Sequence, residues 1–260
     1  MLFRSWQNIT STTVSTSNLE AAEMTKLLNN SYRDLTFGFS NAFIEVATRF
    51  NLEANKVIKA ANSGYSRSQI PIASPGVGGY CLTKDPYIYS SFDSNLNHSK
   101  LASLAREINS SSSFYPYETL KKYCKKIKEP LKNMNIFIIG LAFKGEPPTN
   151  DLRESSSLKT YRLLSKKVKN LFCYDHVLTK NDYDFPKDLN FKSLNYLSKS
   201  DAILILNNHQ NNVKGDFFKL LDNKKRLLIF DGWGQIQKSQ IDRKEHTSEL
   251  QSPMYLVCRL

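Results

Sequence analysis

The stretch NIFIIGLAF, residues 135–143, is a continuous apolar run that contains a glycine and is rich in isoleucine and phenylalanine. Three further runs of this kind follow it: NLFCYD (170–175), DAILILNN (201–208) and RLLIFDGWG (226–234). A helical pattern lies between the first two runs and places Arg153 and Glu154 in its first turn. Apolar strands that alternate with helices are typical of a parallel sheet covered on both faces. The sequence therefore predicts a parallel α/β domain over residues 131–241.

The chain before this domain, residues 18–130, is predicted to be almost entirely helical. A long helix is expected from Ser17, where Ser17 and Glu20 have the spacing of a capping box. Its apolar residues recur at helical spacing, the pattern of a helix with one apolar face; they are Leu27, Leu28, Leu35, Phe39, Phe43, Val46 and Phe50. A polar stripe accompanies them, in which Lys26 and Asn30 are one turn apart. Two side chains of this helix can therefore serve one site.

A loop rich in proline, glycine and serine interrupts the helices, and it ends in SPGVGGYCLTKDP, residues 74–86, here called the cysteine loop. Three glycines allow a close approach of a ligand to the backbone. A helix is expected to begin near Thr83, which would place Cys81 where helix amides favour a thiolate, with Asp85 one turn away. The alternative is a buried, inert cysteine in an ordinary turn. The residues alone leave both open.

Composition limits the classes of function. The chain of 260 residues has 36 Lys and Arg against 24 Asp and Glu, a net charge of +12. The sequence holds no apolar run long enough to span a membrane and no secretion signal, so a cytoplasmic protein is expected. Its four cysteines and four histidines do not cluster, so no metal site is expected. The charge alone would allow a nucleic-acid-binding protein, but no motif of that class accompanies it.

The last residues, 242–260, fit neither domain. They include HTSELQS, which matches the translation of a common sequencing adapter. We expect this tail to be non-native, an expectation that a genomic sequence continuing through it would refute.

Three motifs together resemble one family. GVGGYCLTKDP is similar to the catalytic cysteine loop of the NAD-dependent nucleotide-sugar dehydrogenases, the UDP-glucose/GDP-mannose dehydrogenase family. EAAEMTKLLNNSYRD looks like the start of that family's central domain, and GLAFKGEPPTNDLRES looks like its C-terminal motif. The resemblance runs from about residue 9 to about residue 234. It implies a helical dimerisation domain followed by a Rossmann-like domain that binds a UDP-sugar.

The resemblance also implies an activity and the residues that carry it. An NAD-linked enzyme of this family oxidises the C6 alcohol of a UDP-sugar twice to a uronic acid, for surface polysaccharide. Cys81 would be the nucleophile that forms a thiohemiacetal and then a thioester, with Lys26, Asn30 and Asp85 around the oxyanion and the water. The residues implied to bind the substrate are Arg67, Ile72, Ala73, Ser74, Pro75, Gly76, Val77, Gly78, Gly79 and Lys144. Arg153 would contact NAD, and Arg67 would reach the substrate of a second subunit in a homodimer.

The family's N-terminal NAD-binding domain has no counterpart in these motifs, since no glycine-rich dinucleotide motif follows a strand near Met1. Residues 1–17 are interpreted as a remnant of that domain, and NITSTTVSTS as its last strand. We therefore expect a truncated dehydrogenase that has no turnover by itself. The alternative is a catalytically silent chain that binds a nucleotide sugar or a partner subunit. The sequence favours the UDP-N-acetylhexosamine branch, including UDP-N-acetylmannosamine, over the glucose branch.

Overall fold

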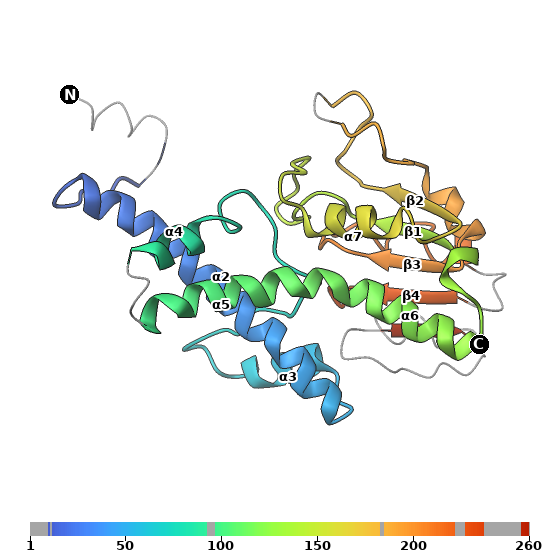
Figure 1. Cartoon of the computed structure of the whole chain (residues 1–260), viewed down its shortest axis with the longest axis horizontal. Helices are drawn as coiled ribbons and strands as arrows, with labels where there is room; N and C mark the ends of the chain where they lie inside the picture. The colour runs from blue at the N-terminus through green and yellow to red at the C-terminus, as the bar shows by residue number, and fades with distance from the viewer. Residues whose placement is uncertain are drawn as a thin grey trace.

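The computed structural model of the chain describes residue 10 and residues 12–92, 97–182, 185–221, 227–236 and 256–259; at 98, 99 and 256–259 it describes only the backbone. Figure 1 shows two parts side by side, a group of helices and a single sheet covered by helices. Helix α5 (Asn97–Ser111) and helix α6 (Tyr115–Ile127) follow each other closely and lead from the first part to the second.

The sheet has the order β2-β1-β3-β4-β5. Its first four strands are mutually parallel, which confirms the predicted parallel α/β fold. The strands are β1 (Asn135–Ile139), β2 (Asn170–Tyr174), β3 (Ala202–Ile205), β4 (Leu227–Asp231) and β5 (Leu256–Arg259). Strand β5 pairs antiparallel with β4 at the edge, where the sequence predicted no element. Apart from residues 256–259, the predicted tail (242–260) lies outside the described residues.

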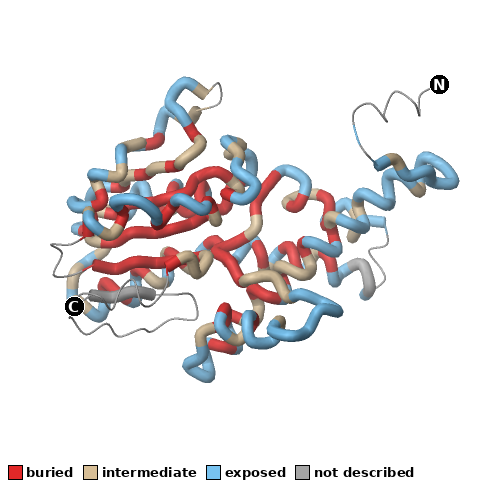
Figure 2. The backbone as a smooth tube through the Cα atoms, turned by 180° about the vertical axis from the view of Figure 1, so that it is seen from behind, coloured by how far each residue is buried: buried red, intermediate tan, exposed pale blue. Residues whose placement is uncertain are grey.

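Strands β1, β3 and β4 are buried along nearly their whole length (Figure 2). The apolar side chains of the sheet belong to two separate clusters, one on each face. Alternate residues of a strand point to opposite faces, so Ile136 and Ile138 join the cluster under α6 and α7 while Phe137 and Ile139 join the other. Short 3-10 helices cover that second face. These covering elements are α6 (Tyr115–Ile127), α7 (Ser156–Leu164), η3 (Leu194–Lys199) and η4 (Lys219–Leu221). Helix α6, which the sequence boundary at residue 130 grouped with the helical domain, thus packs on the sheet.

The helical part is organised around α2, a helix of 31 residues that packs against α4 and α5. Its members are α2 (Leu19–Arg49), α3 (Ala54–Asn62), α4 (Asp85–Ser91) and α5 (Asn97–Ser111), with η1 (Ser112–Phe114) leading into α6 and η2 (Leu131–Asn133) leading into β1. Among the described residues, no helix is long and apolar enough to cross a membrane.

The predicted starts of two helices lie a little too early in the sequence. The cap of α2 is Asn18, not Ser17, because the Asn18 side chain accepts a hydrogen bond from the amide of Ala21. Helix α7 starts after Arg153 and Glu154, since the Ser155 side chain accepts from the Leu158 amide and caps it. The predicted strand before α2 is also absent from its described part: residues 10 and 12–16 form no strand.

The apolar face of α2 points outward. Leu28, Tyr32, Phe39, Val46 and Phe50 are each about half exposed or more, whereas the residues that α2 buries are mostly small or polar. Of the predicted apolar residues, Leu28, Phe39, Val46 and Phe50 thus lie on the outside of this chain, whereas Leu27, Leu35 and Phe43 are half-buried. An exposed apolar stripe of this length points to a partner surface.

Candidate functional site

Asp85 is the centre of a cluster of polar residues that the sequence predicted from two distant segments. Its side chain is fully buried at the start of α4. Asn30 on α2 donates a hydrogen bond to one carboxylate oxygen at 2.6 Å, and the Lys26 ammonium lies 3.8 Å from the same oxygen. Lys84 pairs with the other oxygen at 2.7 Å. The structure therefore brings Lys26, Asn30 and Asp85 together.

The environment of Asp85 keeps its carboxylate charged. Burial by itself opposes the charge, but the hydrogen bonds from Lys84 and Asn30 and the charges of Lys84 and Lys26 outweigh it and lower the pKa of Asp85. The pKa of Lys84 is raised in turn, first by its hydrogen bond to Asp85. The site thus presents an anion held by two cations and an amide.

Cys81 lies in the turn that leads into this cluster, and its side chain is exposed. The turn ends in α4, which begins at Asp85 and not near Thr83 as predicted. The carbonyl of Cys81 accepts the amides of Lys84 and Asp85, so these amides are engaged with the backbone and do not face the thiol.

A cationic side chain, that of Arg153, lies beside the cysteine loop. Arg153 lies over the Tyr80 ring, 5.6 Å from its centre, and forms a two-pronged pair with Asp151. The pKa of Arg153 is raised, first by the hydrogen bond to Asp151 and to a smaller degree by the electrostatic influence of Cys81. Its partner is thus Asp151, whereas Glu154 pairs with Lys159.

The glycines of the cysteine loop are required by close packing within the chain itself. A Cβ at Gly78 would stand 2.5 Å from the Glu154 carbonyl, and one at Gly79 would stand 2.9 Å from the Phe143 ring. Gly76 and Gly79 also have positive φ, which side chains disfavour. The loop is therefore pressed against the segment after β1, and Cys81 is carried to the junction of the two parts of the molecule.

A layer of buried polar residues beneath the cysteine loop was missed by the sequence analysis. Asn41 accepts the Ser74 amide and donates to Asn109 on α5, both at 2.8 Å. Arg106, also on α5, is almost fully buried and pairs with Asp34 of α2 at 2.8 Å. Asp34 is one turn after Asn30 on the polar stripe, a spacing that the sequence did contain; the partners on α5 could not be read from it.

The remaining predicted substrate residues are spread over both parts. Lys144 follows β1 and is half-buried, with its ammonium 5.5 Å from the centre of the Phe143 ring. Beside it, the amides of Gly145 and Glu146 donate to the Asn208 side chain, which follows β3. The loop residues 72–79 lie against α2, α3 and α5, with 73–76 buried, whereas Arg67 is exposed in the loop after α3.

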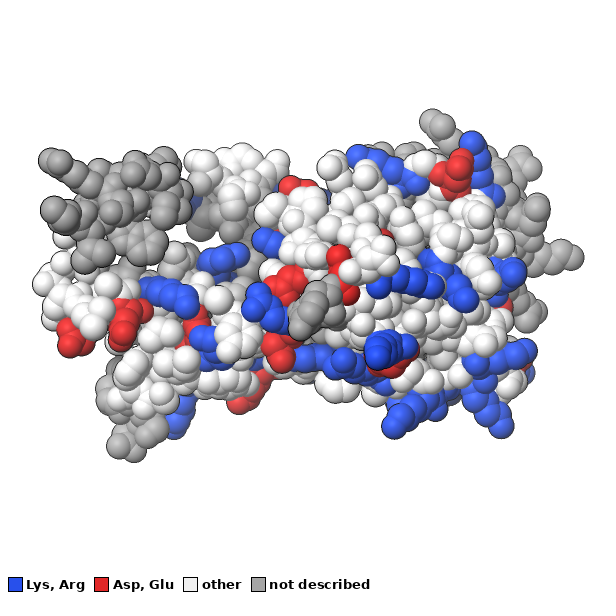
Figure 3. Space-filling view, turned by 90° about the horizontal axis from the view of Figure 1, so that it is seen from above, with Lys and Arg blue, Asp and Glu red and all other residues white. Residues whose placement is uncertain are grey.

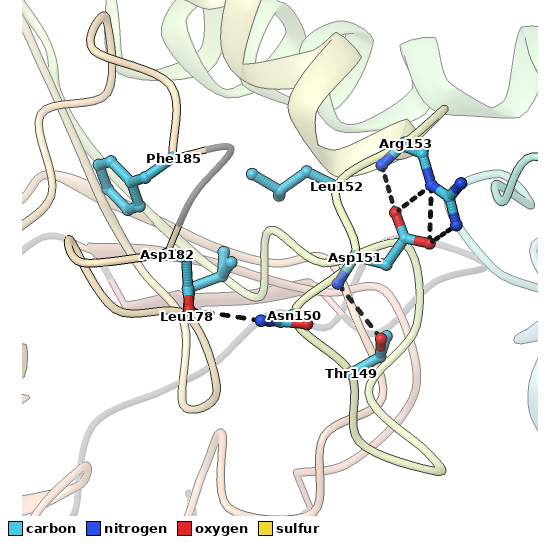
Figure 4. Close-up of a pocket in the computed structure, with 8 residues that line it drawn as sticks. All are labelled: Thr149, Asn150, Asp151, Leu152, Arg153, Leu178, Asp182 and Phe185. Atoms are coloured by element: carbon cyan, nitrogen blue, oxygen red, sulfur yellow. Dashed lines mark hydrogen bonds and ion pairs between the residues drawn. The ribbon is translucent and has the colours of Figure 1, made fainter.

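A cavity of about 470 Å³ lies on the sheet side of Arg153. Figure 4 shows the Arg153 guanidinium turned toward Asp151 and away from the apolar side chains of this cavity. Asn150 and Asp182 bond to each other at 3.3 Å across its edge. The complete lining is Thr149, Asn150, Asp151, Leu152, Arg153, Leu178, Asp182 and Phe185.

The turn after β1 is packed tightly against the segment that follows β3. A Cβ at Gly140 would stand 2.3 Å from the Asn207 side chain, and one at Gly145 would stand 2.0 Å from the His209 backbone. Glycine is therefore required at both positions. Arg153, the residue predicted to contact NAD, is paired with Asp151. Figure 3 shows lysine and arginine side chains gathered mainly over the half with the sheet, where they favour an anionic ligand.

Comparison with known proteins gives matches in both parts. Residues 20–111 match the family model described as UDP-glucose/GDP-mannose dehydrogenase family, central domain. Residues 137–238 match the UDP binding domain of the same family.

Several curated relatives and solved structures are similar to the chain. A UDP-N-acetyl-D-mannosamine dehydrogenase of Methanocaldococcus jannaschii is 31% identical over 222 residues, 83% of this chain and 47% of that protein. The structure of UDP-D-ManNAc dehydrogenase from Pyrococcus horikoshii superposes with a TM-score of 0.73 at 27% identity, over 86% of this chain and 50% of that one. The UDP-N-acetyl-mannosamine dehydrogenase of Staphylococcus aureus gives 0.66 at 27% identity, over 85% and 48%. The chain spans about half the length of the relatives it matches.

Proposed function

Because the chain belongs to the UDP-glucose/GDP-mannose dehydrogenase family, carrying its central and UDP-binding domains, we propose that it is the substrate-binding and nucleophile-bearing part of a nucleotide-sugar 6-dehydrogenase. Such an enzyme oxidises the C6 alcohol of a UDP-sugar to a uronic acid for surface polysaccharide. The observation that carries the proposal is the convergence of Lys26, Asn30 and Asp85 at the turn that bears the exposed Cys81.

The proposed chemistry assigns one role to each of these residues. The thiolate of Cys81 attacks the aldehyde carbon at C6 and forms a thiohemiacetal. Lys26 and Asn30 stabilise the oxyanion that develops, because a cation and an amide donor stand one helical turn apart. When bound, two NAD molecules in turn would each accept one hydride, the first from the C6 alcohol to give the aldehyde and the second from the thiohemiacetal to give the thioester. Water then cleaves the thioester and releases the uronic acid and the free thiol, with Asp85 holding Lys26 and Asn30 in place.

UDP-N-acetylmannosamine is the proposed substrate. The curated relatives and solved structures named above carry that activity in their names. Lys144, at the carboxyl end of β1, is proposed to bind the diphosphate, and the loop residues 72–79 to surround the sugar. Arg153 is proposed to contact NAD, whose main site lies outside the described residues, and Arg67 to reach the substrate of a second subunit.

The second subunit is proposed to dock on α2. Leu28, Tyr32, Phe39 and Val46 follow one another at spacings of four, seven and seven residues, close to a heptad repeat, and are exposed. Helices that carry such a seam pair with each other, so we propose a homodimer in which the apolar faces of two α2 helices meet. A cytoplasmic location fits this enzyme class.

Protection of Cys81 from alkylation tests the proposed site directly. The chain is treated with iodoacetamide with and without UDP-N-acetylmannosamine, and the modified fraction of the tryptic peptide 68–84, which contains Cys81, is measured by mass spectrometry. We expect the UDP-sugar to slow the modification and Lys144→Ala to abolish the protection, while Lys180→Ala, an exposed lysine elsewhere on the domain, retains it. Equal rates with and without UDP-sugar would contradict the proposal.

An NADH assay tests whether the chain turns over by itself. The 260-residue chain alone is expected to form no NADH with UDP-N-acetylmannosamine and NAD, because the domains that it matches are the central and the UDP-binding domain of the family. NADH formation by the chain would refute that expectation, provided that Cys81→Ser abolishes it.

A further inference from the structure

A single buried side chain, Arg106, connects two points of the cysteine loop, one on each side of Cys81, to α2. One of its terminal nitrogens donates to the carbonyl of Val77 at 2.9 Å, and the other donates to the carbonyl of Leu82 at 3.1 Å. These carbonyls stand on either side of Cys81 in the sequence. A planar guanidinium is the side chain that can bridge two acceptors in a fixed geometry.

The same guanidinium is fixed by α2. The nitrogen that contacts Leu82 also donates to Asp34 at 2.8 Å, and Asn109 donates to the same Asp34 oxygen at 2.9 Å. Asp34 is on the stripe that carries Lys26 and Asn30, at intervals of four residues. The helix that supplies the oxyanion donors therefore also anchors the loop that supplies the thiol.

Burying Arg106 and Asp34 costs desolvation free energy that apolar residues at the same positions would not cost. Both Arg106 and Asp34 are almost completely buried, and the second carboxylate oxygen of Asp34 has no hydrogen-bond partner among the described residues. A buried ion pair contributes little net stability compared with apolar residues of similar size. The ion pair lies where the chain holds the irregular, glycine-rich cysteine loop.

We propose that Arg106 and Asp34 are positioning residues of the dehydrogenase site, which hold the backbone on both sides of Cys81 in register with Lys26 and Asn30. The inference rests on the proposed role of Cys81. Arg106 contacts the loop only through main-chain carbonyls, so it acts by placing the thiol and not by touching the substrate.

The reactivity of Cys81 tests the placement without requiring turnover. Second-order rates of iodoacetamide modification of the peptide 68–84 are measured against pH for the wild-type chain, Arg106→Lys and the double variant Asp34→Asn/Arg106→Gln. The lysine keeps the charge but cannot bridge two carbonyls. The double variant removes both buried charges, so no uncompensated charge remains and folding is preserved. The matched control is Asp216→Asn/Arg49→Gln, which makes the same changes at exposed positions.

We expect the variants at Arg106 to react about threefold or more slowly near pH 7, because the thiol leaves its place beside the cations of Lys84 and Arg153. The control is expected to react at the rate of the wild-type chain. Circular dichroism melts show that each rate is taken on folded chain, and the double variant decides the matter if Arg106→Lys does not fold.

A lower melting temperature with an unchanged rate of Cys81 modification in folded variants would overturn the proposal, since a merely structural pair would behave in that way. The result also separates the two proposals. If UDP-N-acetylmannosamine fails to protect Cys81 but the variants still change its reactivity, the positioning role stands and the substrate assignment fails.

Discussion

The sheet and the helical part of this chain bury opposite kinds of side chain. Between the strands and their covering helices the interior is apolar, with Phe137 and Ile139 fully buried. Between α2, α5 and the cysteine loop it is polar, and Asp34, Arg106 and Asn109 occupy the positions that a helical bundle would give to leucine. Apolar packing specifies a stable fold, whereas directional hydrogen bonds specify the position of one loop.

The largest expected effect comes from the apolar interior. Phe137→Ala should lower the free energy of unfolding by roughly 3–5 kcal/mol, since it leaves a cavity in the apolar core. Phe39→Ala, an equal truncation at an exposed position, should change the unfolding of the monomer little. Urea denaturation at a chain concentration below dimer formation measures both. Similar losses for the two variants would contradict the assignment of inside and outside.

The second effect concerns the outward apolar face. If two α2 helices meet as proposed, Phe39→Asp should weaken self-association by about 2 kcal/mol or more, roughly a thirtyfold rise in the dissociation constant, because it places a charge in the proposed contact. Phe92→Asp makes the same change at an exposed site outside the stripe on α2 and should leave association unchanged. Sedimentation velocity gives the dissociation constants. Equal association of all three chains would remove α2 from the interface.

The third effect tests the polar interior. Asn41→Ala should cost about 1–3 kcal/mol of unfolding free energy, because it leaves the Ser74 amide and the side-chain oxygen of Asn109 without their buried partner. Asn29→Ala on the exposed side of the same helix should be nearly neutral. Amide hydrogen exchange should also become faster at Ser74 in the first variant. An unchanged exchange rate there would show that Asn41 does not hold the loop.

The contrast between the two parts also explains what the sequence could predict. The four parallel strands were located because each is an unbroken apolar run, a pattern that burial on both faces imposes locally. Lys26, Asn30 and Asp85 were brought together correctly because two motifs of a family placed them in one site. The strand β5 was not predicted, because the tail that contains it was interpreted as non-native, although MYLVC (254–258) is a short apolar run.

The errors arise where long-range contacts decide. Helical spacing marked Leu28, Phe39 and Val46 as one face of α2 but gave no sign that this chain leaves that face uncovered. Arg106 meets Asp34 across 72 positions of sequence, and a buried ion pair leaves no periodic pattern. The predicted start of α4, near Thr83, falls in the turn before the helix. In that turn the amides of Lys84 and Asp85 already form helix-like hydrogen bonds to the carbonyl of Cys81.

The smallest effect is a pH dependence in the sheet domain. His176 stacks on His209 with 4.8 Å between ring centres, and its Nε2 is buried without a partner among the described residues. Burial and, to a smaller degree, His209 lower the pKa of His176 from its ordinary 6.5, against the opposing charge of Asp175. The neutral ring therefore contributes stability above pH 6.5 that is lost as the pH falls, because the unfolded chain takes up the proton first.

Asp34 titrates in the opposite sense, so the stability curve of the wild-type chain alone is not diagnostic. Burial raises the pKa of Asp34 to about 6, despite Arg106 and Asn109, and its ionisation weakens the fold as the pH rises. His176→Phe keeps the ring stack and removes only the histidine contribution. Between pH 7.5 and 5.5 the wild-type chain should lose more stability than this variant, by up to about 1.4 kcal/mol per pH unit. Parallel curves from urea titrations would show that His176 takes up its proton equally well in the folded chain.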